Sequence, residues 1–347
     1  MQQLTIALIA DTLTKESLLH EAKILDITPT NYKSILKNYK IDFLFIESAW
    51  MGYKDSWRYK IASYSPKYNF KFKFLNYILN SLFPRNNNAL IKAIKYFQQK
   101  NIPCIFWNKE DGIHFDRFIN SAKHCDYIFT VDENCIEKYK QITKKAKCVD
   151  VLPFAIQPKF HNFTGFNFQF NSANFVGSYS KHIHEKRRLW QNAMFNACSK
   201  ICGLTIFDRN CKRTSDNYRF PTLSNTHILP AIPNQETAQI YKDYLISLNV
   251  NTIENSPTMF SRRLIEIIAC GGIAITNNTP AVEKYFKDYC FAIQDISELD
   301  ELLLRLYKYG PTKEELQKIE EGAKYIAKYH TWQVRLEHIL KIINTYK

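Results

Sequence analysis

Short apolar runs alternate with amphipathic helical patterns along this 347-residue chain, and this alternation constrains the fold more than any other feature. Each run has the length of one buried strand, and the segments between runs carry apolar residues at helical spacing. Buried strands alternating with helices are typical of a parallel sheet covered on both faces, so an α/β fold is predicted. The strands predicted in the first half lie at 4–11, 41–50, 102–108, 126–132 and 148–155, and the stretch 17–25 is predicted to be helical.

The alternation is interrupted in the middle of the chain, where Pro, Gly and several Asn residues stand together. A second series of predicted strands follows, at 173–180, 203–210, 227–232, 244–251, 272–278 and 290–295. The chain also exceeds the ~100–200 residues of a typical domain. We therefore predict two α/β domains, 1–157 and 172–325, joined by a linker at 158–171. A C-terminal helix, 326–347, follows; its packing is left open, and a return to the first domain is one option.

The formal charge of +14 indicates an acidic partner, and the charge is unevenly distributed. Residues 54–100 contain ten Lys or Arg against one acid, Asp55, and seven aromatic residues lie between Tyr59 and Tyr77. Basic residues among aromatics suit single-stranded nucleic acid, and they equally suit a segment lying on anionic lipid headgroups. A solvated basic face over Tyr and Phe explains the same pattern, so the three interpretations stay open.

Membrane and metal signals are weak. No window reaches the ~18 apolar residues that cross a bilayer, and the first residues lack the features of a signal peptide. We therefore expect a cytoplasmic protein. The nine cysteines are scattered, and the close pair Cys198 and Cys202 lacks the second ligand pair of a zinc site. Reduced thiols and no bound metal are predicted.

The most informative stretch is "SPTMFSRRLIEIIACGG", residues 256–272. It follows a predicted buried strand, and Pro257 allows a helix to begin near Thr258 because its fixed φ suits a first turn. Gly271 and Gly272 can supply the left-handed residue that ends this helix before the next strand. The stretch therefore belongs to a βαβ unit, and such units bind ligands at the loop after the first strand.

Arg262 and Arg263 stand at this ligand end of the unit. Free backbone N–H groups at the start of a helix attract a diphosphate, and the two arginines add two full charges. The competing interpretation is that both arginines form ordinary surface ion pairs with Glu266. The residues after Glu266 are apolar or small, which indicates a largely covered helix, so this carboxylate needs a partner. A ribose diol is one candidate partner beside the arginines.

Several blocks of the sequence resemble one family. They are "FLFIESAWMG" with Trp57, "IFWNKEDGIHFDRFINSAKHCDYIFTVDENCIEKYK", "VLPFAIQPKFHN", "FVGSY" followed by "EKRR", "IFDRN" and "NVNTIENSPTMFSRRLIEIIACGGIAITNN". In this order they resemble bacterial glycosyltransferases of the spore-maturation (CgeB-like) type over residues 4–335, least so in the basic insertion at 66–90. The resemblance implies the GT-B fold, with two Rossmann-like domains facing a central cleft. The C-terminal domain would bind the nucleotide-sugar, and the N-terminal domain the acceptor.

The resemblance also implies roles for individual residues. Glu266 is similar to the glutamate that contacts the nucleotide ribose, and Arg187 would pair with the phosphates. Thr258 stands where a large retaining family with a Glu-x7-Glu motif has the glutamate that contacts the donor sugar, so the stereochemical outcome stays open with a lean to retention. Gly177 suits a close approach to phosphate and equally a tight turn. The predicted nucleotide-sugar-binding residues are Gly177, Ser178, Tyr179, Arg187, Arg209, Ser256, Thr258, Met259, Phe260, Arg262, Arg263 and Glu266.

Candidate catalytic groups collect in loops that follow predicted strands of the first domain. The loop 108–116, "NKEDGIHFD", follows one strand, and Glu47 and Asp11 follow two others, so these side chains should converge at one sheet edge. We predict catalytic roles for Glu110, His114, Asp11 and Glu47. Structural roles are the alternative for residues of these loops. Asp111 would cap the next helix, His114 would be a half-buried neutral side chain, and Glu47 would pair with a lysine.

The function predicted from these features is a glycosyltransferase acting without a metal, since the chain has no Asp-x-Asp motif. It would move a sugar from a nucleotide-sugar, UDP- or GDP-linked, to a cell-surface polysaccharide, a lipid-linked glycan or a protein. No cofactor is expected beyond this co-substrate. Peripheral contact with the inner face of the cell membrane is expected, and nucleic acid is not. The alternatives are a non-catalytic GT-B-like binding protein for anionic membrane or nucleic acid, and a nucleotide-sugar epimerase.

Overall fold

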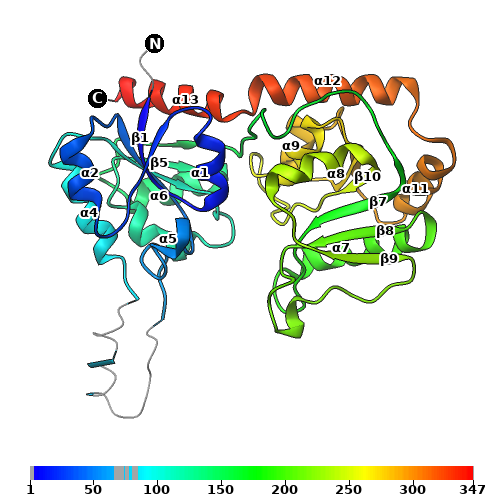
Figure 1. Ribbon diagram of the computed structural model, residues 1–347, viewed down its shortest axis with the longest axis horizontal. Coiled ribbons are helices and arrows are strands. Elements are labelled where there is room, and N and C mark those ends of the chain that lie inside the picture. The colour runs from blue at the N-terminus through cyan, green and yellow to red at the C-terminus, as the bar shows by residue number, and fades with distance from the viewer. Residues whose placement is uncertain (1–3, 66–73, 75–77, 80–84, 347) are drawn as a thin grey trace. The chain divides into compact units, whose positions relative to one another are not determined.

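The computed structural model describes residues 4–65, 74, 78–79 and 85–346 (Figure 1). The basic and aromatic segment predicted at 54–100 therefore lies partly outside the described residues. The chain divides into two compact units: residues 1–153 with 335–347 form unit 1, and residues 154–334 form unit 2. Each unit is built around one six-stranded sheet.

The sheet of unit 1 has the strand order β2-β1-β3-β4-β5-β6, and every pair of neighbours is parallel. Strands β3 and β4 are buried along their whole length, as expected where helices cover both faces. The strands are β1 (Thr5–Ile9), β2 (Lys23–Asp26), β3 (Phe43–Glu47), β4 (Cys104–Asn108), β5 (Tyr127–Thr130) and β6 (Cys148–Val151). Helices of this unit are α1 (Thr12–Leu18), α2 (Tyr32–Asn38), α4 (Asn88–Gln98), α5 (Phe115–Ala122) and α6 (Ile136–Ile142).

The edge strand β2 corrects the prediction of a helix at 17–25. Helix α1 ends at Leu18, and the chain then turns so that β2 runs parallel to β1, with Lys23 opposite Thr5. None of the β2 residues is fully buried. An edge strand of this kind needs no continuous apolar run, so its sequence does not show the period of a buried strand.

The sheet of unit 2 has the order β12-β11-β10-β7-β8-β9 and is also parallel throughout. Strands β7 (Phe170–Gly177), β8 (Leu204–Asp208), β9 (Thr226–Pro230), β10 (Tyr244–Leu248), β11 (Ala274–Asn277) and β12 (Phe291–Ile293) are the six that the apolar runs predicted. The helices are α7 (Glu185–Ile201), α8 (Thr237–Asp243), α9 (Arg262–Ala269), α10 (Pro280–Tyr285), α11 (Glu298–Tyr309) and α12 (Lys313–Tyr329). The strand order reverses between β7 and β10, and ligands of such sheets bind at this switch point.

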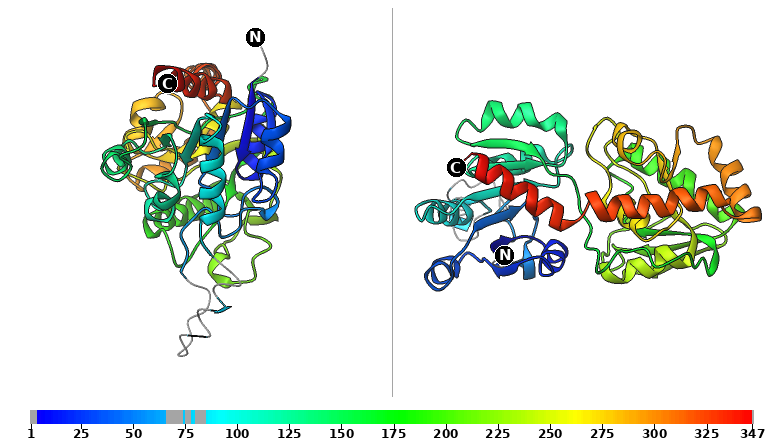
Figure 2. Two further views of the ribbon diagram at one scale, coloured as in Figure 1. Left: turned by 90° about the vertical axis from the view of Figure 1, so that its left-hand side faces the viewer. Right: turned by 90° about the horizontal axis from the view of Figure 1, so that it is seen from above.

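The final helix, α13 (Trp332–Thr345), carries the chain back into unit 1, as one option predicted (Figure 2). Arg335 Nε donates to the carbonyl oxygen of Pro153 at 2.8 Å, and His338 Nε2 lies 2.9 Å from Asp150 Oδ2. Ile339 and Ile343 of the same helix are buried. Unit 1 is therefore completed by residues from the far end of the chain.

We expect Ile339→Ala to destabilise unit 1, because it opens a cavity under α13. Truncation of a fully buried isoleucine costs about 2–5 kcal/mol of unfolding free energy. Lys341→Ala on the exposed face of the same helix is the matched control and should change stability by less than about 0.5 kcal/mol. Urea unfolding followed by fluorescence measures both, and an equal effect of the two changes would mean that α13 does not seal unit 1.

Candidate functional site

The loop between β10 and α9 differs from the prediction that a helix begins near Thr258. Helix α9 begins at Arg262, with Ser261 as its N-cap residue. Ser256 Oγ accepts the backbone N–H groups of Met259 (2.9 Å) and Thr258 (3.3 Å), so the preceding residues form a turn. Gly271 has the positive φ, 73°, predicted for the end of this helix. Both predicted arginines therefore lie in the first helical turn, where the free N–H groups are.

Buried asparagines at the ends of β10 and β11 hold this loop in place, and none of them was predicted as a site residue. Asn251 Oδ1 accepts the backbone N–H of Ser261 at 2.8 Å, and the backbone N–H of Asn251 donates to Asn277 Oδ1 at 2.7 Å. Asn249 Nδ2 and Asn251 Nδ2 both donate to Thr276 Oγ1. These side chains are almost fully buried, so their hydrogen bonds set the start of α9 firmly. Polar residues at the end of an apolar run were the available signal.

Arg263 connects α9 to the end of β7. Its Nε donates to the carbonyl oxygen of Val176 at 2.6 Å, its guanidinium lies 4.4 Å from the centre of the Phe175 ring, and Nη1 is 3.4 Å from Asn249 Oδ1. A Cβ atom at Gly177 would lie 2.6 Å from Arg263 Nη2. A larger residue at 177 would therefore displace this guanidinium or the Phe175 ring, and the φ of Gly177 is not positive.

Arg187 and Arg209 bring further positive charge to the same strand end. Arg187 Nη2 donates to the carbonyl oxygen of Ser178 at 3.0 Å, and the backbone N–H of Arg209 donates to the carbonyl oxygen of Gly177 at 2.9 Å. Burial and the Arg209 charge lower the pKa of Arg187 to about 10. Burial and these two neighbouring charges lower the pKa of Arg263 to about 9, against the opposing effect of Tyr241. The positive charges of these guanidinium groups therefore repel one another. A bound anion would relieve this repulsion, so the arrangement favours anion binding.

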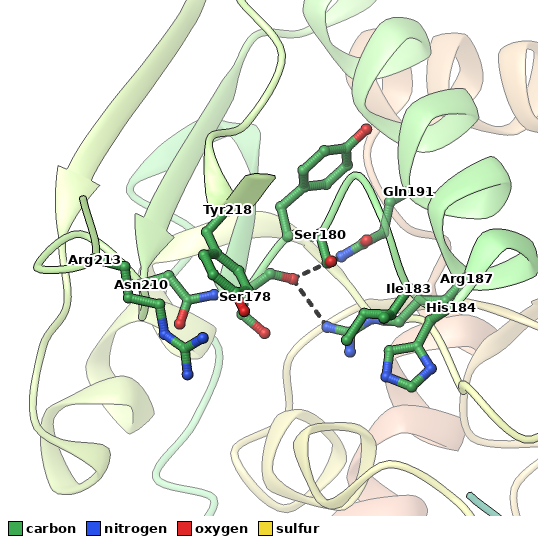
Figure 3. A pocket seen from close by; sticks show the side chains of 10 residues that line it. Ser178, Ser180, Ile183, His184, Arg187, Gln191, Asn210, Arg213 and Tyr218 are labelled. Carbon is green, nitrogen blue, oxygen red and sulfur yellow. Dashed lines mark hydrogen bonds between the residues drawn. The ribbon is translucent and has the colours of Figure 1, made fainter. Parts of the chain in front are cut away.

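A pocket of about 190 Å³ opens between the loops that follow β7 and β8 (Figure 3). Ser178 lies on its wall, and its carbonyl oxygen accepts hydrogen bonds from Arg187 and from Gln191 Nε2. The remaining lining residues are Tyr179, Ser180, Ile183, His184, Asn210, Arg213 and Tyr218. The pocket therefore brings together three residues predicted to bind the nucleotide-sugar: Ser178, Tyr179 and Arg187.

Glu266 has a partner on its own helix and another outside it. Arg262 Nε lies 2.9 Å from Glu266 Oε1, and Asn234 Nδ2 donates to the same oxygen at 3.0 Å. Burial by itself would raise the pKa of Glu266, but Arg262, His161 and Asn234 together lower it, so the carboxylate is ionised at neutral pH. The two arginines therefore play different parts: Arg262 pairs with Glu266, and Arg263 does not.

The remaining residues predicted to bind the donor are mostly buried and pack in the protein beside Arg263 and Glu266. Ser256 and Thr258 are buried in the turn before α9, and Met259 is half-buried. Phe260 is buried against the rings of Phe286 and His330. Tyr179 is almost fully buried, although it borders the pocket.

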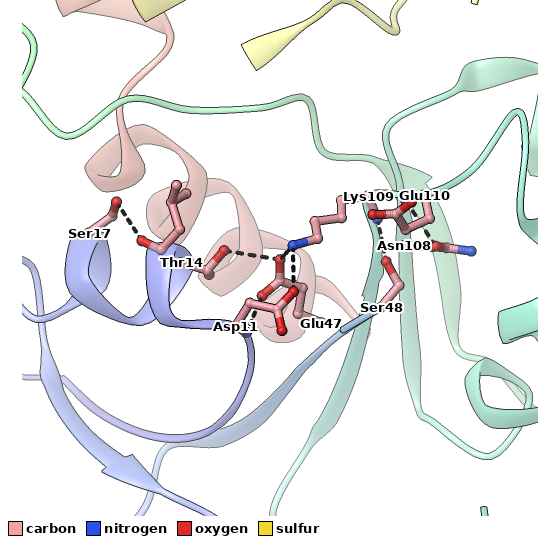
Figure 4. Close-up of polar contacts among 9 residues, drawn as sticks. Asp11, Thr14, Ser17, Glu47, Ser48, Asn108, Lys109 and Glu110 are labelled. Atoms are coloured by element: carbon pink, nitrogen blue, oxygen red, sulfur yellow. Dashed lines mark hydrogen bonds and ion pairs between the residues drawn. The ribbon is translucent and has the colours of Figure 1, made fainter. Parts of the chain in front are cut away.

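In unit 1 the structure brings Asp11 and Glu47 together on one lysine (Figure 4). Lys109 Nζ forms ion pairs with Glu47 Oε1 and, at 3.2 Å, with Asp11 Oδ2. Glu47 is fully buried and also accepts the backbone N–H of Asp11 at 2.9 Å and Thr14 Oγ1 at 3.1 Å. Burial by itself would lower the pKa of Lys109, but Glu47 and Asp11 raise it to about 12. The pairing of Glu47 with a lysine, weighed above as its ordinary role, is present.

Glu110 and His114 occupy different surroundings. The backbone N–H of Glu110 donates to Asn108 Oδ1 at 3.2 Å (Figure 4). His114 is the N-cap residue of α5, and its ring lies edge-on to Trp50 at 5.1 Å between centroids. Burial and the charge of Arg117 lower the pKa of His114, so its imidazole is neutral at pH 7 and can accept a proton.

Asp111 does not cap α5, because His114 occupies that position. Its carboxyl group is instead fully buried, where it accepts Asn108 Nδ2 at 2.6 Å and the Tyr139 hydroxyl at 3.0 Å. Burial raises the pKa of Asp111 to about 7, although hydrogen bonds from Thr130 and Tyr139 oppose the shift. A carboxyl group that titrates near neutrality thus lies in the same loop as Glu110 and His114.

Within 4–65, 74, 78–79 and 85–346, no group of three or more His, Cys, Asp or Glu side chains is arranged to hold a metal ion. No helix in the described part of the chain is long and apolar enough to cross a membrane.

The chain was compared with known proteins. Residues 179–341 match the family model described as glycosyl transferase-like. No curated protein matches the chain.

Solved structures match over nearly the whole chain. An alpha-glucosyltransferase in complex with UDP and a 13-mer DNA has a TM-score of 0.63 at 11% identity, covering 99% of this chain and 100% of that one. Sucrose-phosphate synthase from Thermosynechococcus elongatus has a TM-score of 0.51 at 11% identity, covering 99% of both chains. Anabaena HepE in complex with UDP and glucose has a TM-score of 0.53 at 10% identity, covering 98% of this chain and 91% of that one.

These similarities confirm the predicted GT-B fold of two Rossmann-like domains. The family model and the fold together indicate a glycosyltransferase.

We expect the Asp111 carboxyl group to make folding depend on pH. Its pKa of about 7 in the folded chain exceeds the ordinary value of 3.8, so the folded state binds the additional proton. Its contribution is fully present below pH 4 and is lost as the pH rises through 7, by about 4 kcal/mol at most. Urea unfolding from pH 4 to pH 7.5 should show a smaller loss of stability for Asp111→Asn than for the wild type. Asp116→Asn, an exposed neighbour, should follow the wild type, and identical profiles for all three proteins would contradict the assignment.

Proposed function

We propose that this chain transfers a sugar from a UDP- or GDP-sugar to a glycan, a lipid-linked glycan or a protein, without a metal. The observation that supports this most directly is the cradle formed by Arg187, Arg209 and Arg263 around Gly177. Among the described residues, neither Arg187 nor Arg263 has a carboxylate within ion-pair distance. A diphosphate would supply the negative charge that these guanidinium groups lack.

The cradle suits the leaving group of glycosyl transfer. The acceptor oxygen forms a bond to the anomeric carbon, the bond from that carbon to the phosphate oxygen breaks, and the diphosphate departs with the electron pair. Fixed guanidinium groups stabilise the charge that develops on this diphosphate. Helix α9 begins at Arg262, in the loop region that follows β10, and the first N–H groups of a helix favour an anion. Cations of the chain itself therefore perform the task that a metal performs in other transferases.

Glu266 is proposed to hold the ribose of the nucleotide. It is ionised, and Arg262 and Asn234 keep its position fixed. A carboxylate accepts hydrogen bonds from both hydroxyl groups of a diol. Met259, half-buried in the adjoining loop, is proposed to contact the nucleotide as well.

Unit 1 is proposed to bind the acceptor. Glu110 and His114, in the loop that follows β4, are the candidates that orient the acceptor hydroxyl or take its proton. Asp11 and Glu47 form ion pairs with Lys109. The neighbour crystallised with UDP and DNA is named an alpha-glucosyltransferase, which agrees with the lean to retention of configuration. In a retaining path the proton passes to the departing phosphate; in an inverting path it passes to Glu110 or His114. We also propose that the chain is of the spore-maturation type, that its acceptor is a surface polysaccharide and that it acts at the inner face of the cell membrane. The charge of +14 supports contact with an acidic surface.

Thermal shift with a panel of UDP, GDP, CDP and their sugars tests the donor site. We expect one nucleotide to raise the melting temperature of the wild type. Arg263→Gln should weaken that nucleotide about 10–150-fold, because it removes a charge-assisted contact worth about 1.5–3 kcal/mol. Lys212→Gln, exposed in the loop after β8, is the charge-matched control and should bind as the wild type does. No stabilisation by any member of the panel would rule out the donor site.

Glu266→Gln separates ribose binding from phosphate binding. We expect the affinity for the preferred nucleoside diphosphate to fall about tenfold or more, since a hydrogen-bonding charge is lost. The affinity for inorganic pyrophosphate should hold or improve, because Arg262 loses its anionic partner. Calorimetric titration measures both ligands, and an equal loss of affinity for the two would contradict a ribose contact.

A further inference from the structure

A group of arginines and aromatic rings in unit 1 lies outside the donor site. It consists of Trp50, Tyr59, Tyr64, Arg85 and Arg117, and we call it the arginine–aromatic platform. The Arg85 guanidinium lies 4.4 Å from the centre of the Tyr59 ring, and that of Arg117 lies 5.2 Å from Tyr64 and 5.7 Å from Trp50. Edge-on contacts at 5.0 and 6.2 Å connect Tyr64 to Tyr59 and Trp50. The rings thus hold two guanidinium groups in fixed positions.

Among the residues that the structure describes, the two guanidinium groups have no acidic partner. Within the described part of the chain, neither Arg85 nor Arg117 forms an ion pair or a side-chain hydrogen bond, and Arg117 Nε is shielded from solvent without an acceptor. Arg58, in the same region, shows the ordinary arrangement: its Nη2 lies 2.6 Å from Asp55 Oδ2. A shielded donor without an acceptor costs free energy, and a ligand oxygen would recover it. Guanidinium groups fit the oxygen pairs of phosphate and carboxylate.

The platform adjoins a predicted catalytic residue. Trp50 contacts the His114 ring, and Arg117 follows His114 by one turn at the start of α5. Charge on Arg117 acts on His114 directly, since it lowers the pKa of that imidazole in addition to burial. A ligand group on the platform therefore lies beside the place proposed for the acceptor hydroxyl.

We propose that the arginine–aromatic platform binds an oxyanion of the acceptor, a phosphate or a carboxylate, close to the hydroxyl that reacts. The acceptor is then a glycan that carries carboxylate or phosphate groups. The assignment of this anion to the acceptor rests on the transferase function proposed above. Anion binding itself does not depend on that function, because His114 reports on it within unit 1. Its test and the nucleotide test can therefore fail separately.

The experiment follows the His114 ring by NMR in the full chain labelled at histidine, with the signal assigned from His114→Gln. Methyl phosphate, sodium glucuronate and neutral methyl glucoside are titrated into the wild type, Arg117→Gln and Arg58→Gln. We expect methyl phosphate or glucuronate to move the His114 signal and raise its pKa, because an anion offsets the Arg117 charge. The anion with the larger effect identifies the source as a phosphate monoester or a uronic acid. Methyl glucoside should have at least tenfold weaker effect.

The variants decide the assignment. Arg117→Gln should raise the pKa of His114 without any ligand and should abolish the response to anions, whereas Arg58→Gln should respond as the wild type does. A response that persists in Arg117→Gln, or no response to either anion in the wild type, would overturn the proposal. Vesicles containing phosphatidylglycerol form the last arm: binding of vesicles through Arg117 without any response to the soluble anions would make the platform a membrane contact and also overturn it. Melting temperatures confirm that each variant is folded.

Discussion

The placement of the Arg263 guanidinium is the interaction on which the architecture of unit 2 at its ligand end depends. One side chain connects three elements: it belongs to α9, donates to the end of β7 at Val176, and reaches Asn249 at the end of β10. Its Nη2 and the Phe175 ring occupy the space that a Cβ atom at residue 177 would need, so a larger residue there would displace the guanidinium or the ring. The same guanidinium forms no ion pair with a carboxylate among the described residues, and burial together with the charges of Arg187 and Arg209 lowers its pKa to about 9. The Arg263 guanidinium therefore both connects α9 to the ends of β7 and β10 and attracts an anion.

The corresponding strand ends of unit 1 show the opposite balance. Lys109 is surrounded by Glu47 and Asp11, so the charges there are satisfied within the protein and connect β1, β3 and β4. A buried ion pair of this kind is expensive to break and leaves little charge for a ligand. The predicted catalytic residues Glu110 and His114 lie further along the loop after β4, and the platform around Arg117 adjoins His114. The ion pairs of Lys109 stabilise the fold of unit 1. The Arg117 guanidinium, which has no carboxylate partner among the described residues, can bind an anionic ligand.

Much of the fold followed from local sequence patterns. Strands β8 and β10 inside the sheet of unit 2 are short, mostly apolar and buried along their whole length, and a buried strand has little alternative to such a run. The edge strand β9 is mostly exposed, and its run of apolar residues still predicted it. The failures are of two kinds. Strand β2 is a half-buried edge, so Lys23–Asp26 carries no distinct period. Helix α9 starts four residues later than predicted, at Arg262 instead of Thr258, because Ser256 and Asn251 use their side chains to hold a turn. That second hydrogen bond spans ten residues of sequence, and no helical pattern reports it.

The candidate site divides in the same way. The sequence by itself determined that two arginines and a glutamate stand at the start of a helix that follows a buried strand, and that acidic loops follow the strands of unit 1. Only the tertiary structure decided that Arg262 pairs with Glu266 while Arg263 turns to Val176, which lies 87 residues away in sequence. Neighbouring residues on a helix point about 100° apart, since 3.6 residues complete a turn. Two identical side chains thus meet different surroundings, and those surroundings are assembled from strands that only folding brings together.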